Sequence, residues 1–397
     1  MSESTAEREV SQGGGAASLA YLGATKRYPG ADSDAVRSLD LEVAAGEICV
    51  LVGPSGCGKT TAMRMANRTV EITSGDIEIG GRSVLDRDPS ELRRETGYVI
   101  QEVGLFPHRT VAQNIATIPR LLGWDADRIE QRTATLLQMI GLDPEFGDRY
   151  PAQLSGGQQQ RIGVARALAV DPPLMLMDEP FGAIDPLNRT RLQDEFLRLQ
   201  QQLGKTVLFV THDVDEAIKM GDRIAVLRDG GVLAQYATPA ELLAEPVDDF
   251  VRDFVGTDRA LKRLALIPVS EVELSDPVTV TAGESPAEVM PRIATGALPH
   301  PLLVDRDGRP LGWLDAGRLE SEPVPESATA RPEPVVEEDS TLRDALSAML
   351  QAGVGHAPVV DRRGRLTGVI SVAAISDFLS SGEDIDLEIP AAERVRD

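Results

Sequence analysis

The fold is decided by the stretch ICVLVGPSGCGKTT, which covers residues 48–61. Five apolar residues predict a buried strand, and the complete P-loop pattern G-x-x-x-x-G-K-[ST] follows them directly. In such a loop glycines let backbone N–H groups point at phosphate oxygens, and the next helix adds its positive end. Because a plain glycine-rich turn does not need the whole pattern, the stretch predicts a phosphate-binding loop in an α/β fold.

The pattern assigns roles to individual side chains of this loop. We expect Lys59 to reach the β- and γ-phosphates of a nucleotide, and the Thr60 hydroxyl to coordinate Mg²⁺. Cys57 is interpreted as a tolerated small residue rather than as a redox switch. The predicted nucleotide contacts of the loop are Gly53, Pro54, Ser55, Gly56, Cys57, Gly58, Lys59, Thr60 and Thr61.

An acidic pair ends a second apolar run, which covers residues 174–177. Asp178 stands where a second holder of Mg²⁺ is expected, at the tip of a strand. Glu179 is placed to accept a proton from an attacking water molecule. Such a pair alone would more often face solvent, but beside a P-loop we favour the metal and general-base roles.

Length, charge and cysteine content narrow the function classes. A chain of 397 residues is expected to form two or more domains, and its charge of −23 disfavours a nucleic-acid partner. No apolar run approaches the roughly 20 residues of a membrane span, and the first ten residues do not resemble a secretion signal. Two cysteines provide no disulfide framework. We therefore expect a cytoplasmic protein that serves any membrane process by docking on other subunits.

The first part of the chain is predicted to be a disordered segment followed by one large domain. Residues 1–17 are polar and are predicted to be disordered, whereas residues 18–258 are densely patterned. Buried strands are predicted at 48–52, 174–177 and 207–210, with helical stretches between them. The sequence Asp229-Gly230-Gly231 between two apolar runs predicts a β-hairpin.

An internal repeat organises residues 268–382. HPLLVDRDGRPLG at 300–312 and HAPVVDRRGRLTG at 356–368 each predict strand, Asp/Gly turn and strand, and each follows a helix-like stretch. The repeats are expected at about 268–320 and 331–382. A linker rich in Glu and Pro is predicted at 320–338, and an acidic tail covers 383–397.

One further motif, LSGGQ at residues 154–158, makes the resemblance specific. The order of P-loop, Gln101, LSGGQ, Asp178-Glu179 and His212 resembles the ABC ATPases. The resemblance implies an ABC ATPase domain of the P-loop NTPase class, α/β with antiparallel and helical subdomains. It also implies a head-to-tail homodimer with two sandwiched ATP molecules. In such a dimer the motif contacts the γ-phosphate held by the opposite subunit through Ser155, Gly156, Gly157 and Gln158.

Single residues also match the family one by one. By this resemblance Tyr28 stacks on adenine, although a loop tyrosine can instead pack on the core. Gln101 touches Mg²⁺ and the attacking water and senses the membrane subunits. Asp185 belongs to the dimer-contact loop. His212 holds the γ-phosphate; a lone histidine is more often structural, but its place after the strand at 207–210 favours this role.

Several segments narrow the resemblance to importers of glycine betaine, choline and proline. They are MANR at 65–68, IQEVGLFPH at 100–108, AQNIA at 112–116, PFGAIDP at 180–186 and THDVDEA at 211–217. The paired repeats resemble a tandem CBS module of α+β type. Expected partners are integral-membrane permease subunits and an extracytoplasmic solute-binding protein. Two alternatives stay open: another solute such as an amino acid, and a non-transport ABC ATPase. A regulator in which only the CBS module works is disfavoured, because Lys59, Asp178, Glu179 and His212 are all present.

The repeats depart from the usual adenosine-binding pattern of CBS units, which places Ser or Thr and then Asp three residues later. The second repeat has Ser371 but Ala374 at the acidic position, and the first has Asp315 and Arg318. The ribose-binding carboxylate is therefore missing from both, and AMP or ATP binding of the usual kind is not expected. Sensing of ionic strength, another ligand and a structural role in dimerisation remain alternatives.

Overall fold

The computed structural model describes residues 15–100, 104–182, 184–296, 298 and 300–381. The chain divides into two compact units between Val255 and Gly256, close to the boundary expected at residue 258. Each unit has hydrophobic cores of its own. Gln101 lies outside the described residues, as do residues 1–14 and the acidic tail.

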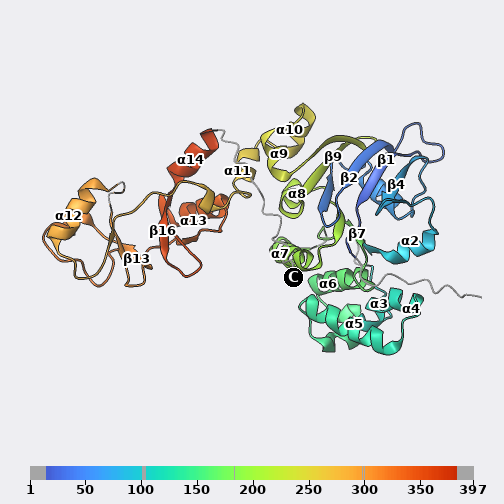
Figure 1. Ribbon diagram of the computed structural model, residues 1–397, viewed down its shortest axis with the longest axis horizontal. Coiled ribbons are helices and arrows are strands. Elements are labelled where there is room, and N and C mark those ends of the chain that lie inside the picture. Colours follow the sequence, from blue (N-terminus) through green and yellow to red (C-terminus); the bar gives the residue numbers. More distant parts are fainter. Residues whose placement is uncertain (1–14, 101–103, 183, 297, 299, 382–397) are drawn as a thin grey trace, which may run out of the picture. The chain divides into compact units, whose positions relative to one another are not determined.

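A six-stranded sheet forms the centre of the first unit (Figure 1), with the strand order β10-β9-β3-β8-β7-β6. Five strands are parallel, and β10 pairs antiparallel with β9, which confirms the predicted hairpin. Every side chain of β3, β7 and β8 is buried, which explains why these strands read as unbroken apolar runs. The strands are β3 (Ile48–Val52), β6 (Thr96–Val99), β7 (Leu174–Asp178), β8 (Thr206–Val210), β9 (Arg223–Arg228) and β10 (Val232–Ala237).

A smaller antiparallel sheet has the order β2-β1-β4-β5. Side chains of β2 largely alternate between buried and exposed, as expected for a sheet with one face on the core. That face packs with α1 and β3 in one hydrophobic cluster that includes Leu39, Leu51 and Met63. The elements are β1 (Leu19–Lys26), β2 (Val36–Val43), β4 (Ser74–Ile79), β5 (Arg82–Ser83) and α1 (Lys59–Ala66).

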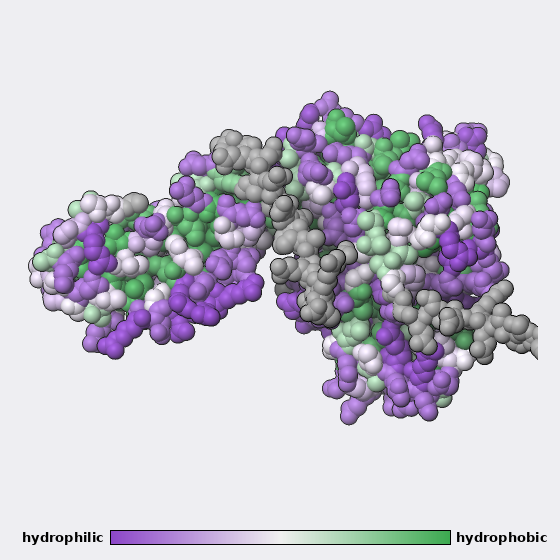
Figure 2. All heavy atoms as spheres, viewed as in Figure 1, coloured by the Kyte–Doolittle hydropathy of each residue, from purple (hydrophilic) through white to green (hydrophobic). Residues whose placement is uncertain are grey.

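Helices α3 to α6 form a helical region between β6 and β7 of the chain (Figure 1). On the face drawn in Figure 2, hydrophilic residues are spread over both units, in keeping with the high charge. Among the helices of the described residues, none combines the length and apolar composition that a membrane span requires. The helices of this unit are α2 (Pro89–Glu95), α3 (Val111–Ile115), α4 (Thr117–Leu121), α5 (Ala126–Met139), η1 (Pro144–Asp148), η2 (Pro151–Gln153), α6 (Gly156–Ala167), α7 (Pro186–Leu203), α8 (Val214–Met220), α9 (Pro239–Ala244) and α10 (Asp249–Val255).

The second unit repeats one order of elements twice. In each repeat a short strand pairs parallel with a second strand, and the second pairs antiparallel with a third. The first repeat holds β11 (Thr279–Val280), α12 (Pro286–Thr295), β12 (Leu302–Val304), β13 (Pro310–Trp313) and η4 (Ala316–Glu320). The second holds β14 (Val336–Glu337), α13 (Leu342–Ala352), β15 (His356–Val360), β16 (Leu366–Ser371) and α14 (Val372–Ser381); α11 (Arg259–Arg263) and η3 (Val269–Glu271) precede both.

The similar turns of the two repeats have one physical origin. In each turn an aspartate carboxylate accepts N–H groups from the residues two and four positions later, at 2.8–2.9 Å, from Asp305 in the first and Asp361 in the second. These bonds lower the pKa of Asp361. The two turns also meet, because the N–H group of Leu366 donates to the Gly308 carbonyl oxygen at 2.9 Å.

The segment predicted as a linker, residues 320–338, is partly built into the first repeat. Val324 is buried in that repeat's core, and its N–H group donates to the carbonyl oxygen of Glu284. The N–H group of Trp313 donates to the carbonyl oxygen of Ala330 at 2.9 Å, and β14 lies at the end of the segment. The buried Val324 and these backbone hydrogen bonds thus hold part of the predicted linker against the first repeat.

Replacing Met349 by alanine should destabilise the second unit without destabilising the first. Met349 is fully buried on α13, and removing such a side chain costs about 2–5 kcal/mol. Leu350→Ala is the matched control, because Leu350 is 65% exposed on the same helix. Thermal unfolding of the full chain should show a lower transition for Met349→Ala alone. Equal melting of the two variants would contradict the assigned core.

Candidate functional site

The predicted phosphate-binding loop connects β3 to α1 and packs against the β9–β10 hairpin. Gly53 and Gly58 have φ values of +152° and +116°. A Cβ atom on Gly53 would lie 2.2 Å from the Leu227 carbonyl oxygen, and one on Gly58 would lie 2.2 Å from that of Ala35. Glycine is therefore required at both positions by conformation and by space. The N–H group of Gly231 donates to the Cys57 carbonyl oxygen and joins the hairpin to the loop.

Lys59 lies inside this loop and is 6% exposed. Its ammonium group donates to the carbonyl oxygens of Gly53 at 2.7 Å and Pro54 at 2.9 Å. A buried charge needs such partners. The contacts fix a positive charge among the backbone N–H groups at the start of α1, where an anion is favoured.

Asp178 ends β7 beside the loop, as the sequence predicted. The residue is 2% exposed, and its carboxylate accepts a hydrogen bond from the Thr60 hydroxyl at 3.0 Å. Burial raises the pKa of Asp178, while the Thr60 hydroxyl and the nearby Arg64 guanidinium lower it. The two oxygens converge from α1 and β7, and hard oxygen donors of this kind suit Mg²⁺.

Glu179 and His212 stand at the tips of neighbouring parallel strands. Nδ1 of His212 lies 3.1 Å from Oε1 of Glu179, and the N–H group of Glu179 donates to the Val210 carbonyl oxygen at 2.9 Å. Glu179 has a φ of +43°, in the left-handed region that side chains rarely adopt. The structure thus brings together a carboxylate and an imidazole that the sequence separates by 33 residues.

Tyr28 lies close to the same loop. Its hydroxyl is 3.4 Å from the Thr61 hydroxyl, and its side chain is exposed. The ammonium group of Lys26 lies 5.2 Å from the centre of the tyrosine ring. An exposed tyrosine ring beside the start of α1 can stack against a flat ligand.

Ser155 to Gln158 of the LSGGQ motif line a different pocket, of about 460 Å³, together with Asp185. Ser155 caps α6, since its hydroxyl accepts the N–H group of Gln158 at 3.3 Å, and Gln158 Oε1 accepts the N–H group of Ser155 at 3.0 Å. Gly156 and Gly157 form the first turn of α6. Asp185 caps α7 by accepting the N–H group of Asn188 at 3.1 Å. The predicted site residues therefore form two groups within one subunit.

Sequence reasoning missed Arg64, whose guanidinium lies 3.6 Å from the Asp178 carboxylate. The available signal was its spacing of four residues from Thr60 on one helix, which puts both side chains on one face. It also missed Glu216, a buried carboxylate that accepts a hydrogen bond from Gln193 at 3.0 Å. This bond connects α8, just after His212, with α7, just after Asp185.

Comparisons with known protein families agree with these two units. The ABC transporter family model matches residues 36–182, and the CBS domain model matches residues 327–381. The first match holds the P-loop, the LSGGQ motif and the acidic pair. The second holds the second of the two repeats.

Curated relatives align over both units. The osmoprotectant import ATP-binding protein OsmV of Salmonella typhimurium is 46% identical over 88% of this chain and 92% of its own length. The glycine betaine/carnitine/choline transport ATP-binding protein OpuCA of Bacillus subtilis is 43% identical over 89% of this chain and 94% of its own. The choline transport ATP-binding protein OpuBA of the same organism is 44% identical over 89% and 94%.

Solved structures resemble the first unit. A dimeric post-hydrolysis structure of the ATP-binding cassette MJ0796, bound to ADP and Pi, is 31% identical with a TM-score of 0.50. It covers 56% of this chain and 98% of its own. A second dimeric structure of MJ0796 is 32% identical with the same TM-score.

Proposed function

Since this chain belongs to the ABC transporter family as an ATP-binding subunit, it binds and hydrolyses ATP, and we propose that Lys59, Thr60, Asp178, Glu179 and His212 perform that reaction. The observation that carries the proposal is their convergence. The Glu179–His212 pair stands at the strand tips beside the loop that holds Lys59, and Thr60 bonds Asp178 there. The remaining loop residues, from Gly53 to Thr61, would surround the phosphates, and all of them except Pro54 have a backbone N–H group to donate.

The donor set fits Mg²⁺ bound together with the nucleotide. Thr60 and Asp178 offer oxygen atoms 3.0 Å apart at the end of the loop, and Gln101 is proposed as a third holder. When bound, the ion neutralises charge on the phosphates. Lys59 supplies a further positive charge, and electrostatic stabilisation of this kind is the main catalytic contribution in phosphoryl transfer.

Glu179 is proposed as the group that activates water. Its carboxylate accepts a proton as the water oxygen bonds to the γ-phosphorus and the bond to the ADP oxygen breaks. His212 is held by Glu179 through Nδ1, at 3.1 Å, so that Nε2 is the ring nitrogen proposed to contact the γ-phosphate. Tyr28 would offer the face of its exposed ring to adenine.

The division of the site residues into two groups supports a head-to-tail dimer. Ser155, Gly156, Gly157 and Gln158 form the start of α6 and line their own pocket with Asp185. A helix start with a hydroxyl favours an anion, and in a dimer it would contact the γ-phosphate held by Lys59 of the partner. The similar MJ0796 cassette is dimeric.

The proposed transport role is uptake of a quaternary amine or a similar osmoprotectant. It rests on relatives that are 43–46% identical over most of the chain and are named for import of osmoprotectants, glycine betaine, carnitine and choline. The chain would work peripherally on the cytoplasmic face of the membrane, with permease subunits and an extracytoplasmic solute-binding protein. The two repeats would act as a tandem CBS module, since they share one order of elements.

Glu179→Gln should bind ATP but hydrolyse it at least about 10²-fold more slowly. The variant loses the proton acceptor but keeps Lys59 and the loop that bind the phosphates. Lys59→Ala should lose most ATP binding. Phosphate release and ATP titration of the purified chain measure the two effects. Normal turnover by Glu179→Gln would remove Glu179 from the proposed mechanism.

The Glu179→Gln chain should also dimerise when ATP is added, because a ligand that binds the dimer shifts the equilibrium toward it. Light scattering measures the change in mass. Adding Ser155→Arg should abolish the ATP-dependent dimer while leaving ATP binding at Lys59. Residues 1–257 alone should behave like the full chain, which separates this contact from any made by the repeats.

Cells that carry Lys59→Ala in place of the natural chain should lose accelerated uptake of labelled glycine betaine in medium of high salt. The expected loss follows from the absence of ATP-driven transport through the partner permease. Uptake of an unrelated amino acid such as glutamine serves as the control and should not change. Unchanged glycine betaine uptake together with reduced glutamine uptake would favour the amino-acid alternative.

A further inference from the structure

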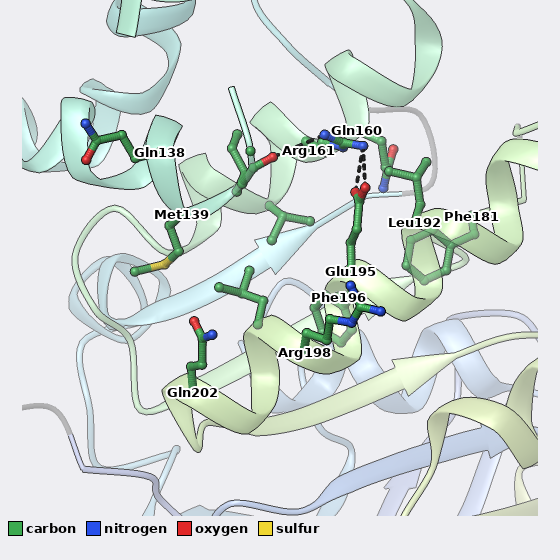
Figure 3. Close-up of a pocket in the computed structure, with 14 residues that line it drawn as sticks. Gln138, Met139, Gln160, Arg161, Phe181, Leu192, Glu195, Phe196, Arg198 and Gln202 are labelled. Atoms are coloured by element: carbon green, nitrogen blue, oxygen red, sulfur yellow. Dashed lines mark hydrogen bonds and ion pairs between the residues drawn. The ribbon is translucent and has the colours of Figure 1, made fainter. Parts of the chain in front are cut away.

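A pocket of about 260 Å³ between α6 and α7 has no role in the proposed reaction. We call it the α6–α7 pocket. Figure 3 shows Met139, at the end of α5, on one side of it and Phe181, Leu192 and Phe196 on the other. Apolar side chains from both sides thus line a space large enough for a small molecule.

Two buried N–H donors border this pocket without a hydrogen-bond partner. Gln160 is 3% exposed, and its amide nitrogen Nε2 has none among the described residues. Within the same part of the chain, the Nε atom of Arg161 is also buried and unpartnered. Both residues lie on α6 and line the pocket. Because an unsatisfied buried donor destabilises the fold, a ligand oxygen that accepts a hydrogen bond here would be stabilising.

The charge of Arg161 is already balanced. Its Nη2 atom lies 2.6 Å from the carboxylate of Glu195, an ion pair that joins α6 to α7 (Figure 3). A charged ligand is therefore not needed to neutralise Arg161. An apolar cavity of about 150 Å³ can hold benzene, so 260 Å³ corresponds to about ten non-hydrogen atoms.

We propose that the α6–α7 pocket binds a small uncharged molecule that has an apolar body and a carbonyl oxygen. The oxygen would accept from Gln160 Nε2, and the body would pack between Met139 and Phe196. The volume of the pocket, its apolar lining and its unpartnered N–H donors all belong to the first unit. It needs neither ATP nor a second subunit.

Such a ligand would regulate ATP hydrolysis, a consequence that rests on the proposed function. The pocket is lined by α6, which starts after Ser155, and by α7, which starts after Asp185. The lining also includes Phe181, two residues after Glu179. A molecule that contacts all three would restrain their movement relative to one another and change the rate of hydrolysis.

The test compares acetophenone with α-methylstyrene, which has the same shape but a CH₂ group in place of the carbonyl oxygen. Titration calorimetry of the full chain without nucleotide should show tighter binding of acetophenone, by about 2- to 12-fold, the net effect of one hydrogen bond. In Gln160→Leu the two probes should bind equally, because the proposal assigns the carbonyl oxygen to Gln160 Nε2 and not to the Nε atom of Arg161. Gln138→Leu, the same change at an exposed position of the pocket, should keep the preference.

A filling variant supplies a second measurement. Val164 is buried on α6 and lines the pocket, so Val164→Phe should abolish binding of both probes. Equal affinity of the probes for the natural chain, no binding of either, or a preference that survives in Gln160→Leu would overturn the site. With binding established, an unchanged ATPase rate at saturating acetophenone would overturn the regulatory role. Failure of the proposed function itself would show as no ATPase activity without any probe.

Discussion

The pairing of the Lys59 ammonium with two backbone carbonyl oxygens is the interaction on which the site depends. A lysine ammonium that is 6% exposed needs hydrogen-bond acceptors in place of water, and the carbonyl oxygens of Gly53 and Pro54 supply them. The loop can turn its carbonyls this way because Gly53 has a φ of +152° and no Cβ to meet the Leu227 oxygen. Contact with β9 therefore fixes the shape of the loop, and the loop fixes the position of the Lys59 ammonium beside the central sheet.

The parallel order of the strands then decides which side chains meet that charge. β7 and β8 are neighbours, and Asp178 pairs with Val210 at their carboxyl ends. Residues that follow these positions must emerge side by side, and these are Glu179 and His212. Parallel sheets collect functional groups at this edge because all their strands end there. One sheet edge thus brings together the loop that holds Lys59, the oxygen atoms of Thr60 and Asp178, and the pair of Glu179 and His212.

Much of this could be predicted from the sequence, because it is local. A complete P-loop after an apolar run carries its own structural context, and the runs at 48–52, 174–177 and 207–210 all became strands of the central sheet. Contacts between distant segments left no such pattern. Nothing in the sequence near Glu216 indicates that its carboxylate accepts a hydrogen bond from Gln193 on another helix. The Glu- and Pro-rich composition around Val324 likewise does not indicate that this side chain is buried. The orphan donor of Gln160 is visible only after α5, α6 and α7 have packed.

The order of strands in the central sheet also governs how the chain can fold while it is being synthesised. β3 ends at Val52, yet its two neighbours are β8 and β9, which begin at Thr206 and Arg223. At about 5–20 residues per second, the ribosome needs roughly 8–30 s to make the residues between Val52 and Thr206. For that time an unbroken apolar strand has no partner in its sheet. The nascent chain must therefore be shielded by its own early elements or by chaperones until the middle of the sheet can close.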